Sequence, residues 1–326
     1  MESLRRKIFS IKSKADFESC AIEVFRYQFQ CNPIYQEFVN QLKIEASNIK
    51  EVKEIPFLPI EFFKSHTVIC SNQTAEISFT SSGTTGNTTS AHPVSDVSIY
   101  KESYLKTFEL FYGQPKDYCI LALLPSYSER QGSSLIYMVD DLLSKSNHAL
   151  SGYYLKSDEK LVKAIDQLRR EKQKTLLLGV TFALLDFADA FKIDLSHCIV
   201  METGGMKGRR KELVREDLHQ QLKKAFAVNE IHSEYGMTEL LSQAYSKGNG
   251  IFQCPPWMSV EAREIDDPLS PALTQKTGGL NVIDLANLNS CSFISTQDLG
   301  KVYPDKSFEV LGRFDNSDIR GCNLLL

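Results

Sequence analysis

The chain has 326 residues, of which 42% are hydrophobic and 24% charged, and its formal net charge is −4. This composition is ordinary for a soluble globular protein and excludes disorder as the main state. An acidic balance disfavours nucleic acid as a partner. Apolar runs such as 120–124 fall far short of the ~18 residues of a membrane span, and the polar N-terminus has no signal-peptide core. We therefore expect a cytoplasmic protein with no membrane anchor.

The first 50 residues are expected to form helices, because apolar side chains such as Phe17, Ala21 and Phe25 recur at helical spacing. Two prolines then interrupt residues 55–63, which predicts an extended, packed linker. Together these segments predict a helical N-terminal part over residues 1–70.

Short apolar runs alternate with helical patterns through the middle of the chain. We expect strands at 119–124, 175–178, 197–201 and 231–233, and helices at 182–191 and 211–226. This alternation is typical of a layered α/β fold in which helices cover a buried sheet. The pattern then changes to short β segments at 280–284, 291–295 and 308–310, which predicts a small β-rich end over residues 278–326.

Eight cysteines are spread along the chain, and no two of them form a C-x-x-C pair. Their positions are Cys20, Cys31, Cys70, Cys119, Cys198, Cys254, Cys291 and Cys322. Without a secretory signal, this spacing favours free thiols, most of them small core residues, over a disulfide or zinc framework.

A short apolar strand at residue 77 leads into the run Thr80-Ser-Ser-Gly-Thr-Thr-Gly86. Glycine lets the backbone turn sharply and approach a ligand, and the hydroxyls with free N–H groups suit phosphate oxygens. The run is neither a Walker A loop nor a dinucleotide G-x-G-x-x-G motif. On these residues alone, a polar surface loop remains the alternative.

This run resembles the phosphate loop of the adenylate-forming enzymes, and three further segments of that superfamily follow in order. They are Glu234-Tyr-Gly-Met-Thr-Glu239, Ser295-Thr-Gln-Asp-Leu-Gly300 and Gly312-Arg-Phe-Asp-Asn316. The resemblance implies layered sheets covered by helices, as in the large N-terminal domain of these enzymes. Only 11 residues follow Asp315, so we expect no mobile C-terminal domain and no lysine from it.

Residues 55–66, 124–135 and 202–209 are similar to the LuxE acyl-protein synthetases. The likeness covers nearly the whole chain, so we expect one LuxE-like adenylate-forming domain over residues 1–326. It implies an ATP-dependent, AMP-forming acid–thiol ligase that activates a fatty carboxylic acid with ATP and Mg²⁺. The acyl group would pass to a thiol, with Cys322 as the expected acceptor, and then to an acyl reductase partner. A thiolate on a short terminal segment suits attack on acyl-AMP.

The resemblance also assigns roles to residues. Ser81, Ser82, Gly83, Thr84, Thr85 and Gly86 would bind phosphate, and Thr203, Gly204 and Gly205 would line the adenine pocket. Tyr235, with Gly236 beside it, would stack on adenine, Thr238 would donate to the α-phosphate, and Glu239 would hold Mg²⁺. Asp298 would accept from the ribose, and Arg313 would reach the ribose or phosphate. Each of these roles has an alternative. Tyr235 could be an ordinary half-buried tyrosine, residues 203–205 a simple strand–helix turn, and Arg313 a surface arginine.

Arg130 is a candidate for steering the substrate carboxylate or a phosphate, and Ser133, Ser134 and Tyr137 are candidates for the acyl pocket, with core packing as the alternative. Residues 87–90 supply no lysine after the phosphate loop, and Gln297 replaces the usual glycine of the third motif. Two other functions stay open. The acceptor could be coenzyme A, or the chain could be a non-catalytic or acyltransferase subunit of a reductase complex.

Overall fold

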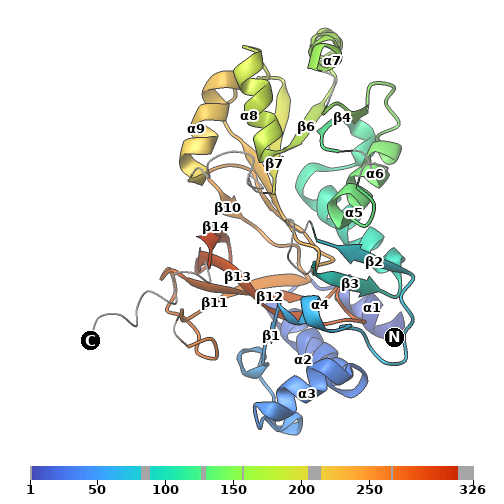
Figure 1. Ribbon diagram of the computed structural model, residues 1–326, viewed down its shortest axis with the longest axis vertical. Helices are drawn as coiled ribbons and strands as arrows, with labels where there is room; N and C mark the ends of the chain where they lie inside the picture. The colour runs from blue at the N-terminus through green and yellow to red at the C-terminus, as the bar shows by residue number, and fades with distance from the viewer. Residues whose placement is uncertain are drawn as a thin grey trace.

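A computed structural model describes residues 2–81, 89–125, 130–155, 158–204, 214–265 and 267–314. Within these ranges the chain forms two six-stranded sheets and a two-stranded ribbon, each packed against helices (Figure 1). No helix in the described part of the chain is both long and apolar enough to cross a bilayer.

The first large sheet is parallel over five of its strands. In spatial order it contains β5 (Gly152–Tyr153), β4 (Cys119–Leu123), β6 (Thr175–Val180), β7 (Cys198–Thr203), β8 (His232–Tyr235) and the antiparallel β9 (Ala244–Ser246). Every residue of β4 and β6 is buried, because helices cover both faces of the sheet. This explains why these strands read as continuous apolar runs.

Five helices belong to this half of the molecule, which is the upper half in Figure 1. They are α5 (Val97–Tyr112), α6 (Ser134–Ser146), α7 (Asp158–Glu171), α8 (Thr181–Ala190) and α9 (Arg215–Phe226). In Figure 1, α8 and α9 lie on one side of the strands and α5 and α6 on the other. The fold is therefore a helix–sheet–helix layer here.

The second large sheet is mainly antiparallel. Its order is β10 (Ile251–Phe252), β14 (Phe308–Arg313), β13 (Phe293–Val302), β12 (Gly278–Asp284) and β11 (Met258–Arg263), with β1 (Leu58–Pro59) parallel to β13. The ribbon pairs β2 (Ile77–Thr80) with β3 (Ala91–Val94). The expected β-rich end thus belongs to a sheet that also recruits strands from earlier in the chain.

The N-terminal part of the chain is helical, and two of its helices pack against the second sheet. Its helices are α1 (Glu2–Ile8), α2 (Lys14–Cys31), α3 (Pro33–Gln41) and the short α4 (Phe62–Ser65), with 3₁₀ turns at Ala46–Asn48, Val52–Glu54 and Pro115–Asp117. A capping box of Ser13 and Asp16 starts α2. The rings of Phe25 and Tyr35 then contact Phe293 of β13, at centroid distances of 6.3 and 6.1 Å.

The strands and helices expected in the middle of the chain are present, with ends that differ by a few residues. The helical pattern at 211–226 corresponds to α9, which begins at Arg215, and residues 211–213 lie outside the described part. The expected linker at 55–63 is interrupted by β1 and by the start of α4, because Leu58 and Pro59 pair with β13. Strands β3, β5, β9, β10 and β11 were not expected, since each is short or lacks clear alternation.

The expectation that all cysteines are free was wrong for one pair. Cys31, at the end of α2, forms a disulfide with Cys70, and their Cα atoms are 4.7 Å apart. The backbone N–H of Ser71 donates to the carbonyl of Cys31 over 2.7 Å, so the two segments are already joined there. The pair is separated by 39 residues and has no local motif, which is why the sequence did not reveal it.

Candidate active site

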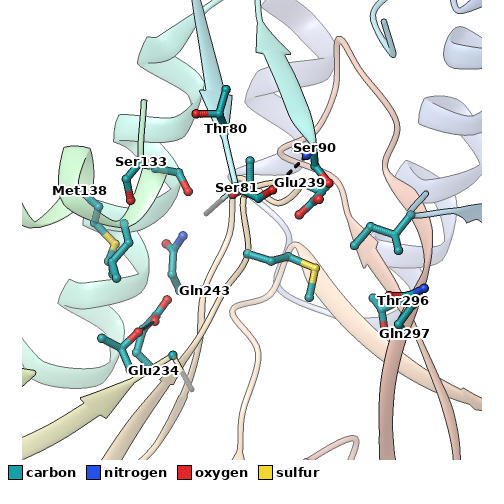
Figure 2. Close-up of a pocket in the computed structure, with 18 of the residues that line it drawn as sticks. Thr80, Ser81, Ser90, Ser133, Met138, Glu234, Glu239, Gln243, Thr296 and Gln297 are labelled. Atoms are coloured by element: carbon teal, nitrogen blue, oxygen red, sulfur yellow. Dashed lines mark hydrogen bonds between the residues drawn. The ribbon is translucent and has the colours of Figure 1, made fainter. Parts of the chain in front are cut away.

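A cavity of about 470 Å³ lies between the two large sheets. Its lining comes from α4, the ribbon, α5, α6, the ends of β7 and β8, the loop after β8, and strands β13 and β14 (Figure 2). Thr203 and Glu234 are paired in register at the carboxyl ends of β7 and β8. The crevice outside the carboxyl ends of parallel strands is where open α/β sheets commonly bind ligands.

The start of the glycine–hydroxyl loop lies at this cavity. Ser81 follows β2 and lines the cavity together with Ser90. The N–H of Ser81 donates to the carbonyl of Ser90 over 3.0 Å, and the hydroxyl of Ser81 accepts from the N–H of Ser90 over 2.9 Å (Figure 2). These bonds close the base of the loop beside the cavity. The other predicted loop residues, Ser82, Gly83, Thr84, Thr85 and Gly86, lie outside the described residues, as do Gly205 and Cys322.

Glu239 brings one buried carboxylate to the cavity, at 6% exposure. Burial raises the pKa of Glu239, and a hydrogen bond with Ser90 opposes that rise. In the described ranges no three His, Cys, Asp or Glu side chains gather as a metal cage. A single carboxylate still fits Mg²⁺, which commonly binds one or two carboxylates and completes its shell with substrate phosphates and water.

The loop that carries Thr238 and Glu239 is held by residues that motif reading did not reveal. His92 contacts the carbonyl of Thr238 over 2.9 Å, and the amide of Asn287 donates to the carbonyl of Glu239 over 2.7 Å. Asp284 is fully buried and accepts the N–H groups of residues 241 and 242, each over 2.8 Å. The second sheet and the ribbon therefore fix the loop that the first sheet presents.

Tyr235, Asp298 and Arg313 come from three different motifs and meet in one cluster. The hydroxyl of Tyr235 donates to Asp298 Oδ2 over 2.8 Å, and Arg313 Nε donates to Asp298 Oδ1 over 2.9 Å. The ring of Tyr235 packs against Phe252 and Phe308. Neither Tyr235 nor Asp298 lines the cavity, whereas Arg313 does. The contacts of these residues with adenine and ribose stay predictions. The geometry shows directly that Asp298 holds the Arg313 side chain in place.

Three cationic side chains belong to the described lining: Lys64, Arg130 and Arg313. Burial lowers the pKa of Arg130, and the Asp298 carboxylate raises the pKa of Arg313. Lys64, on α4, was not a sequence candidate. Its only sequence signal is its place in the segment at 55–66.

The end of the cavity beside α6 carries both polar and apolar side chains, with Leu135 and Met138 next to Ser133 and Ser134. Of the three acyl-pocket candidates, Ser133 and Ser134 line the cavity, whereas Tyr137 packs its ring against Phe79 and Tyr100. Glu234 also lines it, and Thr203 donates its hydroxyl to Glu234 Oε2. Burial, assisted by the neighbouring Glu202 charge, raises the pKa of Glu234 to about 7.

A sequence profile described as "Acyl-protein synthetase, LuxE" matches residues 9–326. The chain belongs to the LuxE acyl-protein synthetase family. The enzyme class expected from the sequence, an ATP-dependent acid–thiol ligase, is that of this family. Comparison with curated protein sequences found no match.

Solved structures with the same fold include adenylate-forming ligases. A 2-hydroxyisobutyryl-CoA ligase in complex with 2-HIB-AMP and CoA is 11% identical, with a TM-score of 0.66 over 94% of this chain and 72% of that one. ATP-bound MatB from Rhodopseudomonas palustris is 16% identical, with a TM-score of 0.53 over 72% of this chain. The match spans 47% of the MatB chain, about half its length. At these identities the likeness establishes the adenylate-forming fold of this LuxE-family chain.

The residues missed by sequence reasoning share one property. Lys64, His92, Glu234 and Gln243 reach the site through contacts between distant segments, such as His92 with Thr238. Besides the segment position of Lys64, the sequence held a signal for Glu234. It is a charged residue near the end of a buried strand, directly before the motif tyrosine, and such a residue needs a partner or a ligand.

Proposed function

We propose that this LuxE-family chain is an acyl-protein synthetase that activates a carboxylic acid with ATP and Mg²⁺ and transfers the acyl group to a thiol. The observation that carries the proposal is that Ser81, Glu239 and Arg313, from three separate motifs, line one cavity. This arrangement supports the proposal that the cavity binds a nucleoside triphosphate beside a carboxylic acid.

The proposed reaction has two steps. A carboxylate oxygen of the acid attacks the α-phosphorus of ATP, pyrophosphate leaves, and a mixed anhydride, acyl-AMP, is formed. A thiolate then attacks the acyl carbon, AMP leaves, and a thioester results. Mg²⁺ bound at Glu239 would neutralise phosphate charge when present.

The chain's own groups would stabilise the first step electrostatically. Arg313, held by Asp298, would face the nucleotide, and Arg130 and Lys64 would offset the negative charge that the acid and the triphosphate bring together. Thr238, whose backbone carbonyl contacts His92, would donate its side-chain hydroxyl to the α-phosphate.

The cysteines that the structure describes limit which thiol can accept the acyl group. Burial raises the pKa of each free cysteine in these ranges, namely Cys20, Cys119, Cys198, Cys254 and Cys291. A raised pKa leaves little thiolate, so these groups are poor nucleophiles. Cys322 is therefore our proposed acceptor, with delivery to an acyl reductase, and coenzyme A is the alternative acceptor.

One labelling experiment tests the sequence of steps. The protein is incubated with a labelled carboxylic acid, ATP and magnesium, and then resolved on a denaturing gel. We expect label that requires ATP and is lost in Cys322→Ser but kept in the control Cys198→Ser, since burial raises the pKa of Cys198 to about 12. Acid-dependent exchange of pyrophosphate into ATP without protein label would assign coenzyme A or another external thiol. Absence of both signals would reject the proposed ligase and favour a subunit role in a reductase complex.

A further inference from the structure

The predicted adenine pocket is bordered by the backbone that leaves the end of β7. Thr203 and Gly204 line the cavity there. Gly204 has a φ of +70°, which glycine adopts without strain. Because glycine also has the greatest backbone freedom of any residue, a contact from outside the segment is needed to hold this conformation before a ligand binds.

That contact comes from the first residue of α8, which follows the neighbouring strand. Strands β6 and β7 are parallel, and Val180 at the end of β6 is paired with Thr203. Thr181 and Gly204 come next in the two segments, and the hydroxyl of Thr181 donates to the carbonyl of Gly204 over 2.7 Å. A side chain thus continues the pairing of the two strands past their last backbone partners. Thr181 is 3% exposed and does not line the cavity, so it acts on the site through Gly204.

A buried carboxylate fixes the surroundings of the Thr181 hydroxyl. Glu202 is 3% exposed, and its Oε1 accepts from Nη1 of Arg215, the first residue of α9, over 2.7 Å. Burial opposes ionisation of Glu202, but a hydrogen bond with His219 and the charge of Arg215 outweigh it, so the pKa of Glu202 lies below its ordinary value. The Oε2 of this carboxylate is 3.3 Å from the Thr181 hydroxyl. A carboxylate and a carbonyl can only accept, and the single hydroxyl proton goes to the nearer of them, the carbonyl of Gly204.

Building on the proposed ligase function, we propose that Thr181 is a positioning residue for ATP. Its hydroxyl holds the Gly204 peptide in the orientation against which the adenine ring lies, and the ion pair of Glu202 with Arg215 keeps that hydroxyl in place. Holding a glycine segment in its binding conformation before the nucleotide arrives removes an ordering cost from binding. The contact should therefore strengthen the binding of ATP and leave the chemical step and the binding of the acid unchanged.

Acid-dependent exchange of pyrophosphate into ATP by the full chain tests this role. Hexanoate, decanoate and myristate are first compared on the native chain, and the best of them is kept. Thr181→Val nearly keeps the shape of the side chain and removes its hydroxyl. We expect KM for ATP to rise about 10-fold, while kcat and KM for the acid change less than about 2-fold. Titration calorimetry with ATP alone should show the same rise in Kd, which measures binding without turnover.

A second pair of variants isolates the hydroxyl. Thr181→Ser keeps it and should hold KM for ATP within about 2-fold of the native value. Thr181→Ala differs from that serine variant only by the hydroxyl oxygen, so the pair gives the same comparison if valine does not fit the buried position.

Thr175→Val is the matched control on the same strand. Thr175 is the first residue of β6, at the end away from the cavity, is 1% exposed, and donates its hydroxyl to the carbonyl of Gln173 over 3.0 Å. Each valine variant loses one hydrogen bond of a buried hydroxyl, so Tm should fall by a similar amount in both. Only Thr181→Val should raise KM for ATP.

The outcomes separate this inference from the function on which it rests. If KM and Kd for ATP stayed at their native values in Thr181→Val while Tm fell as in Thr175→Val, Thr181 would support only the fold and the inference would be overturned. A rise in KM for ATP that Thr181→Ser shared would show that the hydroxyl does not hold the segment, with the same consequence. A rise in KM for the acid without one for ATP would place Gly204 beside the acid and also overturn the inference. Exchange by the native chain with none of the acids would reject the proposed function itself.

Discussion

The two large sheets contribute to the site in different ways. The parallel sheet presents residues at the carboxyl end of a strand or just beyond it, such as Thr203, Glu234 and Glu239, and these line the cavity directly. The antiparallel sheet lines the cavity with Thr296, Gln297 and Arg313. Behind that lining, its Asp298 holds Arg313, and its Asp284 accepts the N–H groups of residues 241 and 242 in the loop after β8. Variants of Thr203, Glu234 and Glu239 should therefore change activity without lowering stability. Variants of Asp298 and Asp284 should lower both.

The largest effect is expected for Glu239→Gln on the cavity side. The change removes the proposed magnesium ligand, and we expect pyrophosphate exchange to fall by about 10²–10³-fold. Since burial raises the pKa of Glu239, neutralising it should not lower the free energy of unfolding. Glu264→Gln, which alters a surface ion pair with Lys276, is the matched control and should keep full activity. A Glu239→Gln variant with unchanged exchange would remove Glu239 from the metal site.

Glu234→Gln tests whether the buried carboxyl group of Glu234, which lines the cavity, has a raised pKa. The folded-state pKa of Glu234 is raised from 4.5 to about 7. Its contribution to stability is therefore complete below pH 4.5 and is lost as the pH rises through about 7. Between pH 4.5 and about pH 8, the unfolding free energy of the native protein should fall relative to that of the variant by about 3 kcal/mol.

Urea denaturation of both proteins across this pH range measures the difference, and the subtraction removes the titration of other groups. Parallel pH profiles for the two proteins would show that Glu234 is ionised at its ordinary pKa and is not the desolvated group described above.

Asp298→Asn is the corresponding change in the antiparallel sheet. Asparagine keeps the shape but loses the charge that holds Arg313, and it leaves either Tyr235 or Arg313 poorly paired. The Arg313 side chain is 70% exposed, so solvent screens the ion pair and we expect a loss of only about 1 kcal/mol in unfolding free energy. KM for ATP should rise about 10-fold as Arg313 loses its fixed position. Asp305→Asn, in a surface turn with Ser307, is the control. If Asp298→Asn lost activity without losing stability, Asp298 would belong with the residues that contact the ligand.

The same division explains how much the sequence could predict. Short strands with continuous apolar runs and the four motifs are local features, so the α/β class, the main strands and candidates such as Ser81, Glu239 and Arg313 could be read directly. The contacts of the antiparallel sheet depend on segments that lie far apart in the chain, as in the hydrogen bond between Tyr235 and Asp298, which are 63 residues apart. Such pairing has no local signature, and the disulfide between Cys31 and Cys70 escaped prediction for the same reason.

The smallest effect is expected at Ser290, which supports the loop through one intermediate residue. Burial lowers the pKa of His92 to about 4, so its ring is neutral at pH 7. Its Nδ1 faces the carbonyl of Thr238 over 2.9 Å and must carry the proton, because a carbonyl can only accept. Its Nε2 is then the acceptor, and the hydroxyl of Ser290 donates to it over 2.9 Å.

Ser290→Ala would leave that ring nitrogen buried and unpaired, at a cost of about 1 kcal/mol in unfolding free energy. Because the ring also holds the carbonyl of Thr238, we expect KM for ATP to rise about 2-fold to 3-fold with kcat nearly unchanged. Ser270→Ala is the matched control, because the hydroxyl of Ser270 donates to Asp267 in a surface turn away from the loop. If Ser290→Ala lost stability while both kinetic constants stayed unchanged, the antiparallel sheet would support the fold without positioning the loop, and the distinction between the two sheets would be one of stability alone.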